Sequence, residues 1–426
     1  MMLNIIYNFI FIPILYSIRF ILLLTNKKYK LRERRCNELL HLIPEKSNKK
    51  RILFHSASMG EFEQAKPIIE IIKNELDIEV IASFYSPSGL ENQLNYKYAD
   101  YFVYLPFDSK NKIKAYFDKI KPEVCVIVRY EYWFNFIDQM SKLNIKSMLV
   151  AATIPNGTYH TGMFTRALYR STINKVDTIY SNDQSSYDFY KSVYNNELII
   201  SSDTRFDRIL EKVESSKLKP IISKSIFNDR FVIILGSSWA EDEELFLHKN
   251  ILNDDRLLIL FVPHEPTPFH LNSLIVNINK YSSSKIEESK LNYILLSELL
   301  ENKTKSNKFK HIIVDSIGKL LSLYSIADAA YIGGGFGAGV HSVTEPAGYG
   351  LALATGPKMQ NSPDAINLRD DGCLEIIKNT KHLENWIHNT LFKKEKRILI
   401  ENKSRSYLID RKGSSYIIAN KIKSIM

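Results

Sequence analysis

Short apolar, β-branched runs alternate along this chain with stretches in which apolar residues recur at helical spacing. From Arg51 onward the runs have the length of strands, and helical patterns such as 110–121 and 133–143 separate them. This alternation predicts parallel sheets that are covered by helices. The expected strands form two series: 51–56, 78–84, 101–105, 123–129, 146–151, 177–181 and 198–201, then 231–235, 257–262, 293–296, 311–314, 329–332 and 352–355.

A polar, lysine-rich segment with Pro220 separates the two series. A chain of 426 residues exceeds what one hydrophobic core usually serves, which favours two domains. We therefore expect an α/β protein of the GT-B class, with two doubly wound, Rossmann-like sheets facing a cleft, although other two-domain α/β proteins share this layout. The cleft is the expected ligand site. The expected parts are a membrane anchor (1–25), an amino-terminal acceptor domain (26–211), a linker (212–229), a carboxy-terminal nucleotide-sugar domain (230–395), and a helical tail (396–426) that packs back on the first domain or lies near the membrane.

The amino terminus is almost entirely apolar over residues 2–24. A helix over 5–24 would be roughly 30 Å long, which is enough to cross a bilayer. Arg19 lies near one end, where its side chain can reach the interface, but Arg19 and Pro13 together leave a helix in the membrane plane as an alternative. No basic residue precedes the apolar run and no small-x-small site follows it, so a cleaved signal peptide is disfavoured.

A basic cluster follows this apolar run. The ten Lys/Arg and three Asp/Glu between residues 25 and 51 give a local excess of +7, so the rest of the chain carries only about +3 of the total of +10. By the positive-inside rule, the cluster places the downstream chain on the cytoplasmic side, and it would attract anionic lipid headgroups. The small remaining charge argues against nucleic acid as a partner.

Hydrophobic residues make up 45% of the chain and charged residues 24%, which is typical of a folded protein and excludes wholesale disorder. The three cysteines, Cys36, Cys125 and Cys373, lie far apart and form no CxxC pair. This spacing predicts a reducing compartment and no structural zinc.

Glu61 is the most informative residue of the first series. It follows the apolar run 52–54 in the small-residue segment 56–61 and precedes a helical pattern over 67–76. Such a position lies at the carboxyl edge of a parallel sheet, where open α/β proteins bind ligands, and a carboxylate there can act as a general base. The alternative is a favourable charge in the first turn of a helix. Glu131, after the strand 123–129, would share the site.

Basic residues near the end of the first domain form a second candidate group. Arg205 and Arg208 lie in the segment 203–208. They either supply positive charge where the domains meet or belong to an inter-domain network of salt bridges.

The second series carries an anion-binding pattern. Its glycine loop, 333–339 with Gly334 and Gly335, follows a strand, and glycines there let backbone N–H groups approach a phosphate; the alternative is a tight turn. Downstream, Glu345 can accept hydrogen bonds from a ribose diol or can simply complement a helix start. The other candidates at strand ends are Ser237 and Ser238 as anion ligands or helix caps, His264 and His341 as nucleotide contacts, and the turn 315–319.

Together these segments resemble the 3-deoxy-D-manno-octulosonic acid (Kdo) transferase family of lipopolysaccharide synthesis. Besides the anchor, the matching segments run in the family's order from Ser58 to Ala347: 58–61, 131–135, 203–208, 236–239, 263–264, 317–320 and 341–347. The segment 204–208 and the order of the whole set are specific, whereas a single glycine loop is not.

The resemblance implies an inverting GT-B glycosyltransferase that moves Kdo from CMP-Kdo to a lipid A precursor, lipid IVA, without a metal or other cofactor. It implies a place on the cytoplasmic face of the inner membrane, with membrane lipids contacted through the amino-terminal segment. Matched residue by residue, Glu61 is the general base, and Glu131 and Arg205 stabilise the transition state. The matched CMP contacts are His264, Glu265, Ile317, Gly318, Lys319, Ser342, Val343, Thr344 and Glu345.

The sequence departs from the family at three of these contacts. Where the family usually has Arg-His, this chain has His264-Glu265. Where the family usually has Gly-Glu, it has Gly318-Lys319, and the segment 342–345 replaces the usual Asn-Pro-Leu-Glu. Glu345 preserves the ribose contact, while the individual phosphate and cytosine contacts stay undecided. Two alternatives remain open: another GT-B transferase with a different nucleotide-activated donor, and a catalytically silent membrane-associated protein of the same fold.

Overall fold

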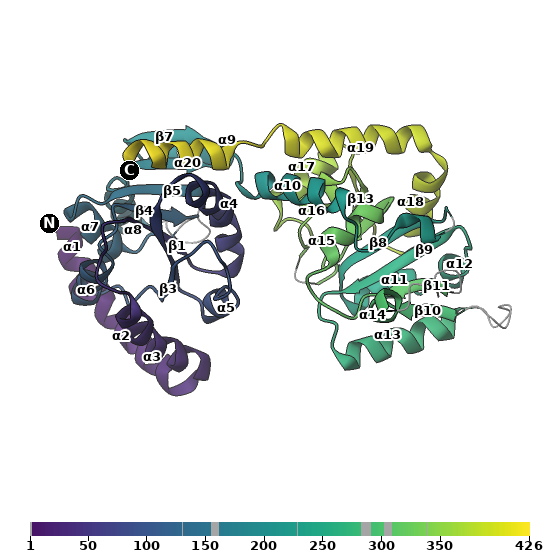
Figure 1. Ribbon diagram of the computed structural model, residues 1–426, viewed down its shortest axis with the longest axis horizontal. Helices are drawn as coiled ribbons and strands as arrows, with labels where there is room; N and C mark the ends of the chain where they lie inside the picture. Colours follow the sequence, from purple (N-terminus) through teal and green to yellow (C-terminus); the bar gives the residue numbers. More distant parts are fainter. Residues whose placement is uncertain are drawn as a thin grey trace. The chain divides into compact units, whose positions relative to one another are not determined.

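The computed structural model describes residues 2–129, 131–154, 162–227, 229–282, 291–301, 309–337 and 339–426. Ala338 of the glycine loop therefore lies outside the described residues. The chain divides into two compact units, both drawn in Figure 1. Unit 1 holds Met1–Asp207 with Arg411–Met426, and unit 2 holds Arg208–Asp410.

Unit 1 is built on a seven-stranded parallel sheet in the order β3-β2-β1-β4-β5-β6-β7. The strands are β1 Lys50–Ser56, β2 Ile78–Phe84, β3 Tyr101–Tyr104, β4 Val124–Val128, β5 Lys146–Ala152, β6 Thr178–Ser181 and β7 Glu197–Ile200. The helices that follow the first strand are α4 Met59–Glu75, α5 Pro87–Glu91, α6 Lys110–Ile120, α7 Phe134–Lys142, α8 Met163–Ile173 and α9 Gln184–Lys191, and the last helix of the chain, α20 Ser414–Ile425, also belongs to this unit.

Alternating side chains of the strands bury both faces of this sheet, because successive residues of a strand point to opposite sides. Ile52 and Phe54 pack with α4 and α20 on one face, whereas Leu53 between them packs with α6, α7 and α8 on the other. A parallel sheet covered on both faces has apolar strands throughout, which explains why the apolar runs marked the strands in the sequence.

Unit 2 has a second seven-stranded parallel sheet, in the order β10-β11-β9-β8-β12-β13-β14. Its strands are β8 Phe231–Ser238, β9 Leu257–Pro263, β10 Leu291–Leu295, β11 Phe309–Ile313, β12 Ala329–Ile332, β13 Ala352–Thr355 and β14 Leu374–Ile376. Its helices are η3 Lys224–Phe227, α11 Ala240–Phe246, α12 Lys249–Leu252, α13 Pro268–Tyr281, α14 Leu296–Glu301, α15 Leu320–Leu323, η5 Tyr324–Ile326, α16 Thr344–Gly348, α17 Pro363–Asp370, α18 Thr380–Phe392 and α19 Lys394–Ile409.

The prediction of two doubly wound parallel sheets is confirmed, and every expected strand is present within a few residues. Strand β14 was missed, because three residues at the sheet edge are too short to form an apolar run. Helix α4 begins at Met59, well before the expected start at residue 67, because Ser58 caps it and Pro67 lies inside it.

The boundary between the units falls within α10 (Arg205–Leu218), and η3 follows it, so helices occupy much of the segment expected as a linker. Of the carboxy-terminal residues, α19 belongs to unit 2, whereas α20, yellow in Figure 1, packs against α4 in unit 1. Asp207 ties the two ends of unit 1 together, because its carboxylate accepts the N–H groups of Gly413 at 2.5 Å and Ser415 at 2.9 Å.

The amino terminus continues as helices α1 Met2–Ile6, η1 Tyr7–Phe11, α2 Ile12–Thr25 and α3 Lys27–Leu42. Residues Leu3–Thr25, with a mean hydropathy of 1.9, form a helix that is long and apolar enough to cross a membrane by length and composition. Polar contacts attach its first turns to unit 1. Tyr7 donates its hydroxyl to Asp108 at 2.8 Å, and the side-chain amides of Asn8 and Asn135 exchange two hydrogen bonds of 3.1 and 3.0 Å.

The second half of this helix also contacts other parts of unit 1. The guanidinium of Arg19 donates to Glu33 of α3 at 3.0 Å and lies over the ring of Phe107. The other side of the helix exposes large apolar side chains: Ile5, Phe9, Ile10, Ile14, Ile18, Phe20, Ile21 and Leu24. Within the basic cluster, Arg32 is buried and donates to two backbone carbonyls, so it is a structural residue and does not face headgroups.

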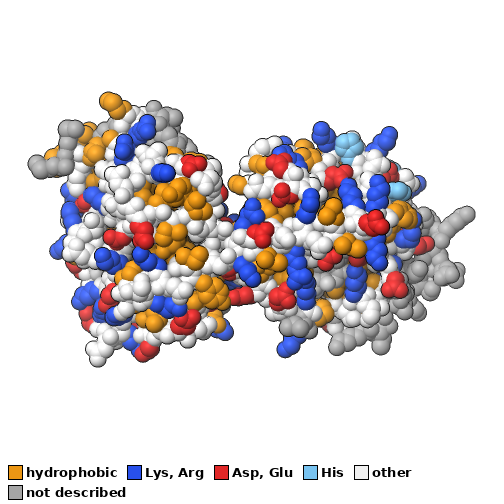
Figure 2. Space-filling model, turned by 90° about the horizontal axis from the view of Figure 1, so that it is seen from above, with side chains coloured by type: hydrophobic (Ala, Val, Ile, Leu, Met, Phe, Trp, Pro, Cys, Tyr) orange, Lys and Arg blue, Asp and Glu red, His pale blue; other side chains and the backbone are white. Residues whose placement is uncertain are grey.

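The Lys and Arg side chains do not form one continuous patch on the face shown in Figure 2. There the Lys and Arg side chains of both units are interspersed with Asp and Glu and with apolar side chains.

Candidate functional site

The strand order of each unit reverses direction beside its first strand, and the candidate residues lie at these reversals. In unit 1 the reversal falls between β1 and β4, which are followed by Glu61 and Glu131. In unit 2 it falls between β8 and β12, which carry Ser238 and the glycine loop. Ligands of open α/β sheets bind outside the carboxyl ends of the strands at such a switch point, so the topology places both predicted sites where this fold binds ligands.

Glu61 is held by the start of α4. Its Oε2 accepts the backbone N–H groups of Ala57 at 2.5 Å and Ser58 at 3.2 Å, while the Ser58 hydroxyl accepts the Glu61 N–H at 3.4 Å. This reciprocal capping box gives Glu61 the structural role that the sequence left as the alternative. The same contacts fix a buried carboxylate in place without an ion pair to any described residue.

Glu131 is partly buried beside two donors. Its Oε2 accepts the indole N–H of Trp133 at 2.7 Å and lies 3.8 Å from Nε2 of His55. His55 is the sixth residue of β1, is completely buried, and contacts Ser83 through Nδ1 at 3.0 Å.

The two glutamates have opposite pKa shifts. Burial, followed by the negative charge of Glu131, raises the pKa of the Glu61 carboxyl. Burial also acts to raise the pKa of Glu131, but His55 and the indole N–H of Trp133 outweigh it and hold that pKa below its usual value. Such a pair provides one carboxyl with a raised proton affinity and one that favours its ionised form.

Arg205 belongs to a buried network at the same edge. Its guanidinium donates to Asp203 at 2.6 and 3.0 Å, and Asp203 also accepts the side-chain amide of Gln64 at 2.7 Å. The oxygen of Gln64 in turn accepts Nε–H of Arg129 at 3.1 Å. Arg205 is therefore ion-paired within its own unit, although about a third of its side chain stays exposed.

In unit 2 the protein itself supplies a carboxylate to the amides that the sequence assigned to an anion. Asp242 accepts the N–H of Trp239 at 3.0 Å and that of Gly334 at 2.8 Å. The Ser238 hydroxyl donates to Glu243 at 2.7 Å. The Ser238 hydroxyl and the Gly334 amide, which the sequence assigned to an anion, therefore bind carboxylates of the protein itself. Both carboxylates lie in the first turn of α11, where negative charge complements the helix dipole.

A stack of rings borders this switch point instead. The rings of His264 and His341 are parallel at 4.3 Å, and the indole N–H of Trp239 donates to Nε2 of His341 at 3.1 Å. His264 and Trp239 are exposed. This cluster joins the turns after β8, β9 and β12, and it offers flat, polar-edged surfaces of the kind on which a nucleobase stacks.

The other predicted donor contacts lie at the same edge of the sheet. The turn after β11 holds Ile317, which is 80% exposed, Gly318 at a φ of +81°, and Lys319 at the start of α15. Glu265 is exposed after β9, Ser237 has a φ of +52°, and Gly335 is buried against Gly356.

At α16, Val343 and Thr344 are buried, the Ser342 hydroxyl contacts that of Thr344 at 3.1 Å, and Glu345 lies in the first turn.

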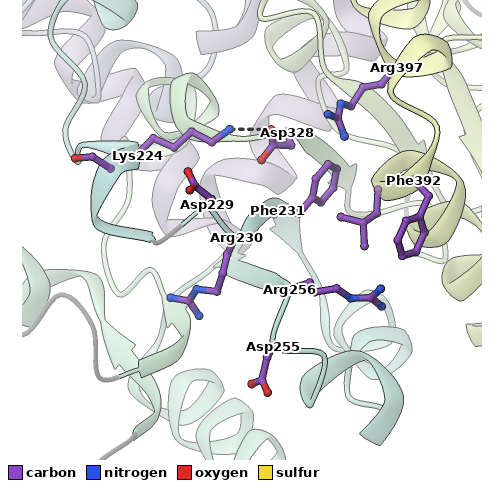
Figure 3. A pocket seen from close by; sticks show the side chains of 11 residues that line it. Lys224, Asp229, Arg230, Phe231, Asp255, Arg256, Asp328, Phe392 and Arg397 are labelled. Carbon is purple, nitrogen blue, oxygen red and sulfur yellow. Dashed lines mark hydrogen bonds and ion pairs between the residues drawn. The ribbon is translucent and has the colours of Figure 1, made fainter.

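A cavity of about 860 Å³ in unit 2 lies at the opposite, amino-terminal edge of the sheet. Its lining includes Phe231 at the start of β8 and Arg256 and Asp328, which directly precede β9 and β12 (Figure 3). Asp328 is paired with Lys224 at 2.7 Å, and the guanidinium of Arg256 pairs with Asp254 at 2.6 Å. These cations have partners, and the cavity is not part of the predicted donor site.

No group of three or more His, Cys, Asp or Glu side chains that could hold a metal ion occurs in the part of the chain that the structure describes. Sequence reasoning missed four residues of the unit 1 site: His55, Gln64, Arg129 and Asp203. The available signals were a histidine inside an apolar strand for His55 and a left-handed φ of +66° for Arg129, of which only the first is visible in a sequence.

Comparison with known proteins gives a consistent picture. Residues 32–208 match the family model described as 3-deoxy-D-manno-octulosonic-acid transferase (kdotransferase). The chain is 24% identical over 366 residues to the 3-deoxy-D-manno-octulosonic acid transferase of Haemophilus influenzae, covering 82% of this chain and 81% of that protein. The protein of the same name from Rickettsia bellii is 24% identical over 413 residues, or 90% and 93% of the two chains.

A bifunctional glycosyltransferase/methyltransferase of Fusobacterium nucleatum is 27% identical over 353 residues. The alignment covers 78% of this chain but only 52% of that relative, so the chain spans about half of its length.

Solved structures share the fold. A UDP-GlcNAc 2-epimerase from Neisseria meningitidis aligns over 88% of this chain and 100% of its own, with a TM-score of 0.60 and 12% identity. MurG of Acinetobacter baumannii aligns over 88% and 99%, with a TM-score of 0.53 and 12% identity. These likenesses bear out the GT-B fold that the sequence predicted.

Proposed function

We propose that the chain, whose residues 32–208 match the Kdo transferase family, moves Kdo from CMP-Kdo to a lipid A precursor, lipid IVA, with inversion and without a metal. The observation that carries this proposal is the pair of glutamates with opposite pKa shifts, Glu61 buried and Glu131 partly buried, at the switch point of unit 1. A glycosyl transfer with inversion needs one base for the attacking hydroxyl and a stabilised, positively charged transition state.

In this proposal Glu61 accepts the proton of an acceptor hydroxyl through its second oxygen, Oε1, because Oε2 is occupied by the capping box. The resulting oxygen attacks the anomeric carbon of Kdo, and the bond to CMP breaks on the opposite face, so the CMP phosphate leaves with the electron pair. Glu131 stays ionised and stabilises the oxocarbenium-like transition state. Arg205 contributes less charge than a free arginine would, since it is paired with Asp203.

The donor nucleotide is assigned to unit 2. The rings of Trp239, His264 and His341 would hold the base or phosphate, Lys319 would neutralise the phosphate, and Glu345 would accept the ribose hydroxyls. Three features support this assignment: the ring stack, the α15 start and the position of all these residues at the carboxyl edge of one sheet. The remaining predicted contacts, Glu265, Ile317, Gly318 and 342–344, would shape the same edge.

Membrane attachment is part of the proposal, and the structure favours a helix that lies in the membrane plane. One stripe of the helix, from Asn4 to Arg19, makes hydrogen bonds and ion pairs to unit 1, while the opposite side is apolar and exposed. A helix that crossed the bilayer would have to abandon the buried bond between Tyr7 and Asp108, and stranding a buried carboxylate is costly. We therefore assign the exposed apolar face to the cytoplasmic leaflet of the inner membrane.

The test of the reaction is mass spectrometry of the lipid product after incubation of the membrane-attached protein with CMP-Kdo and lipid IVA. A product heavier by one or more Kdo residues supports the proposal. Thermal protection by UDP but not by CMP would instead favour a transferase with another donor, and no protection by any nucleotide would favour a catalytically silent protein.

The test of the membrane arrangement uses a single reporter cysteine at position 2 of a variant that lacks the three native cysteines. In sealed vesicles with the cytoplasmic face outward, an in-plane helix leaves this cysteine accessible to a membrane-impermeant maleimide. Labelling only after the vesicles are opened would show a spanning helix. A matched cysteine at position 412, in the connection before α20, reports the orientation of the vesicles.

A further inference from the structure

We propose that His55 is a positioning residue that holds the carboxylate of Glu131 through its Nε2–H, an assignment that rests on the function proposed above. His55 lies on β1 and Glu131 follows β4, the neighbouring strand, so the two residues belong to the switch point of unit 1. The sequence comparison with the family motifs assigned no role to this histidine.

Two buried side chains, Ser83 and Tyr116, lie behind His55. Nδ1 of His55 lies 3.0 Å from Oγ of Ser83 on β2, and the hydroxyl of Tyr116 on α6 donates to the same Oγ at 2.8 Å. Tyr116 is buried, and burial holds the pKa of its phenol well above the ordinary value, so its proton stays in place.

Proton counting along these contacts sets the tautomer of His55. Tyr116 uses its single proton on Ser83, so Ser83 can still donate its own proton, and among the described residues the acceptor within reach is Nδ1 of His55. A neutral imidazole that accepts at Nδ1 carries its proton at Nε2. These two contacts thereby place an N–H donor on the side of the ring that faces Glu131.

Nε2 of His55 is completely buried and has no hydrogen-bond partner among the residues that the structure describes. Oε2 of the Glu131 carboxylate lies 3.8 Å from this nitrogen. This distance exceeds a hydrogen bond, yet a buried donor without a partner is costly. A modest shift of Glu131, whose other restraint is the indole N–H of Trp133, would satisfy it. The geometry therefore favours closure of this contact when a ligand orders the site.

In the proposed reaction the two glutamates then have different roles: Glu61 accepts the proton and Glu131 supplies a fixed negative charge. His55 aims the carboxylate of Glu131 and favours its ionised form, and the charge of Glu131 in turn keeps a proton acceptor of suitable basicity on Glu61. The titratable groups that interact with Glu131 are His55 from β1, Glu61 from α4 and Tyr85 after β2.

The matched variants His55→Gln and His55→Asn test the assignment. The amide nitrogen of glutamine reaches about as far as Nε2, whereas that of asparagine reaches only as far as Nδ1, so glutamine preserves the donor to Glu131 and asparagine preserves only the Ser83 contact. We expect His55→Asn to lower kcat by about tenfold to a hundredfold, as a small misplacement of a catalytic group does. His55→Gln should stay within about threefold of the parent.

The double variant with Glu131→Gln separates positioning from a general loss of stability. If His55 acts through Glu131, adding His55→Asn to Glu131→Gln changes the residual rate by less than about threefold. A multiplicative loss would overturn the assignment, as would equal losses for the asparagine and glutamine variants in the parent.

A readout that needs no transfer activity keeps this inference separate from the proposed reaction. Selective ¹⁵N labelling of histidine should show one neutral imidazole, absent from the His55→Gln spectrum, that is protonated at Nε2. If no Kdo transfer occurs but this signal is present, the proposed function fails while the arrangement of His55 stands. A signal from the Nδ1–H tautomer would overturn the inference even in an active enzyme.

Discussion

Glu61 and Glu131 follow two adjacent parallel strands of unit 1, and after burial itself the charge of Glu131 is the largest cause that raises the pKa of Glu61. Local contacts hold each acid in place, but only the pairing of the strands couples the two. Glu61 is positioned by a capping box at α4, and Glu131 by Trp133 and His55. The relationship makes one carboxyl a proton acceptor and the other a fixed negative charge, and it leads to the first two predictions.

Replacement of Glu61 by glutamine should abolish most transfer without disturbing the fold. Glutamine preserves an oxygen for the N–H groups of Ala57 and Ser58 but cannot accept a proton, so we expect kcat to fall on the order of 10²–10⁴-fold. CMP affinity should be unchanged, because the nucleotide is assigned to unit 2. Radiolabelled Kdo transfer and CMP titration measure the two quantities. Glu63→Gln, on the same helix, is the control, and near-normal transfer by Glu61→Gln would refute the base assignment.

Replacement of Glu131 by glutamine should move the acid limb of the pH–rate profile to lower pH. A negative charge nearby raises the pKa of Glu61, so its removal lowers that pKa and keeps the base deprotonated further into acid. The overall rate falls at the same time, since the transition state loses its negative neighbour. Profiles of kcat/KM between pH 5 and 8, with Glu63→Gln as the reference, measure the shift. An acid limb that stays in place or moves to higher pH would contradict the coupling.

Replacement of Gly335 by alanine should unfold or distort the glycine loop. A Cβ at this position would lie 2.5 Å from the backbone nitrogen of Gly356, and backbone cannot move aside as a flexible side chain does. We expect a loss of about 1–3 kcal/mol in the free energy of unfolding and weaker CMP binding. Gly337→Ala is the matched control, because its nearest neighbour would be at 4.0 Å. Thermal unfolding with and without CMP distinguishes the two, and equal stability would contradict the packing.

Replacement of Asp207 by alanine should release α20 from unit 1. Its carboxylate accepts the N–H groups of Gly413 and Ser415 at the start of that helix, and loss of such a cap costs about 1–2 kcal/mol. Hydrogen exchange of residues 414–425 should accelerate, while CMP binding by unit 2 stays unchanged. Asp410→Ala, in the same connection, serves as the control. Unchanged exchange would show that the apolar contacts of α20 suffice to hold it.

Part of this structure could be read directly from residue patterns. In a parallel sheet that is buried on both faces, a strand is an uninterrupted apolar run, so β1, β12 and β13 were located from sequence. Strand β14 was not, because its three residues at an edge carry too little of this pattern. The start of α4 was placed too late, since Pro67 resembles a helix beginning although it lies within the helix.

Local sequence thus determined the order of strands and helices, the two-sheet architecture and the positions of acids at strand ends, because periodicity and turn chemistry act over a few neighbouring residues. Contacts between distant segments decided everything else. Only the sheet order brings His55 beside Glu131, Asp242 to the amide of Gly334, and α20 back to α4. The spacing of Ser58 and Glu61 encodes the helix cap of Glu61. Whether a carboxylate is also a network member or a poised base depends on burial and on partners dozens to hundreds of residues away, which no spacing in the sequence encodes directly.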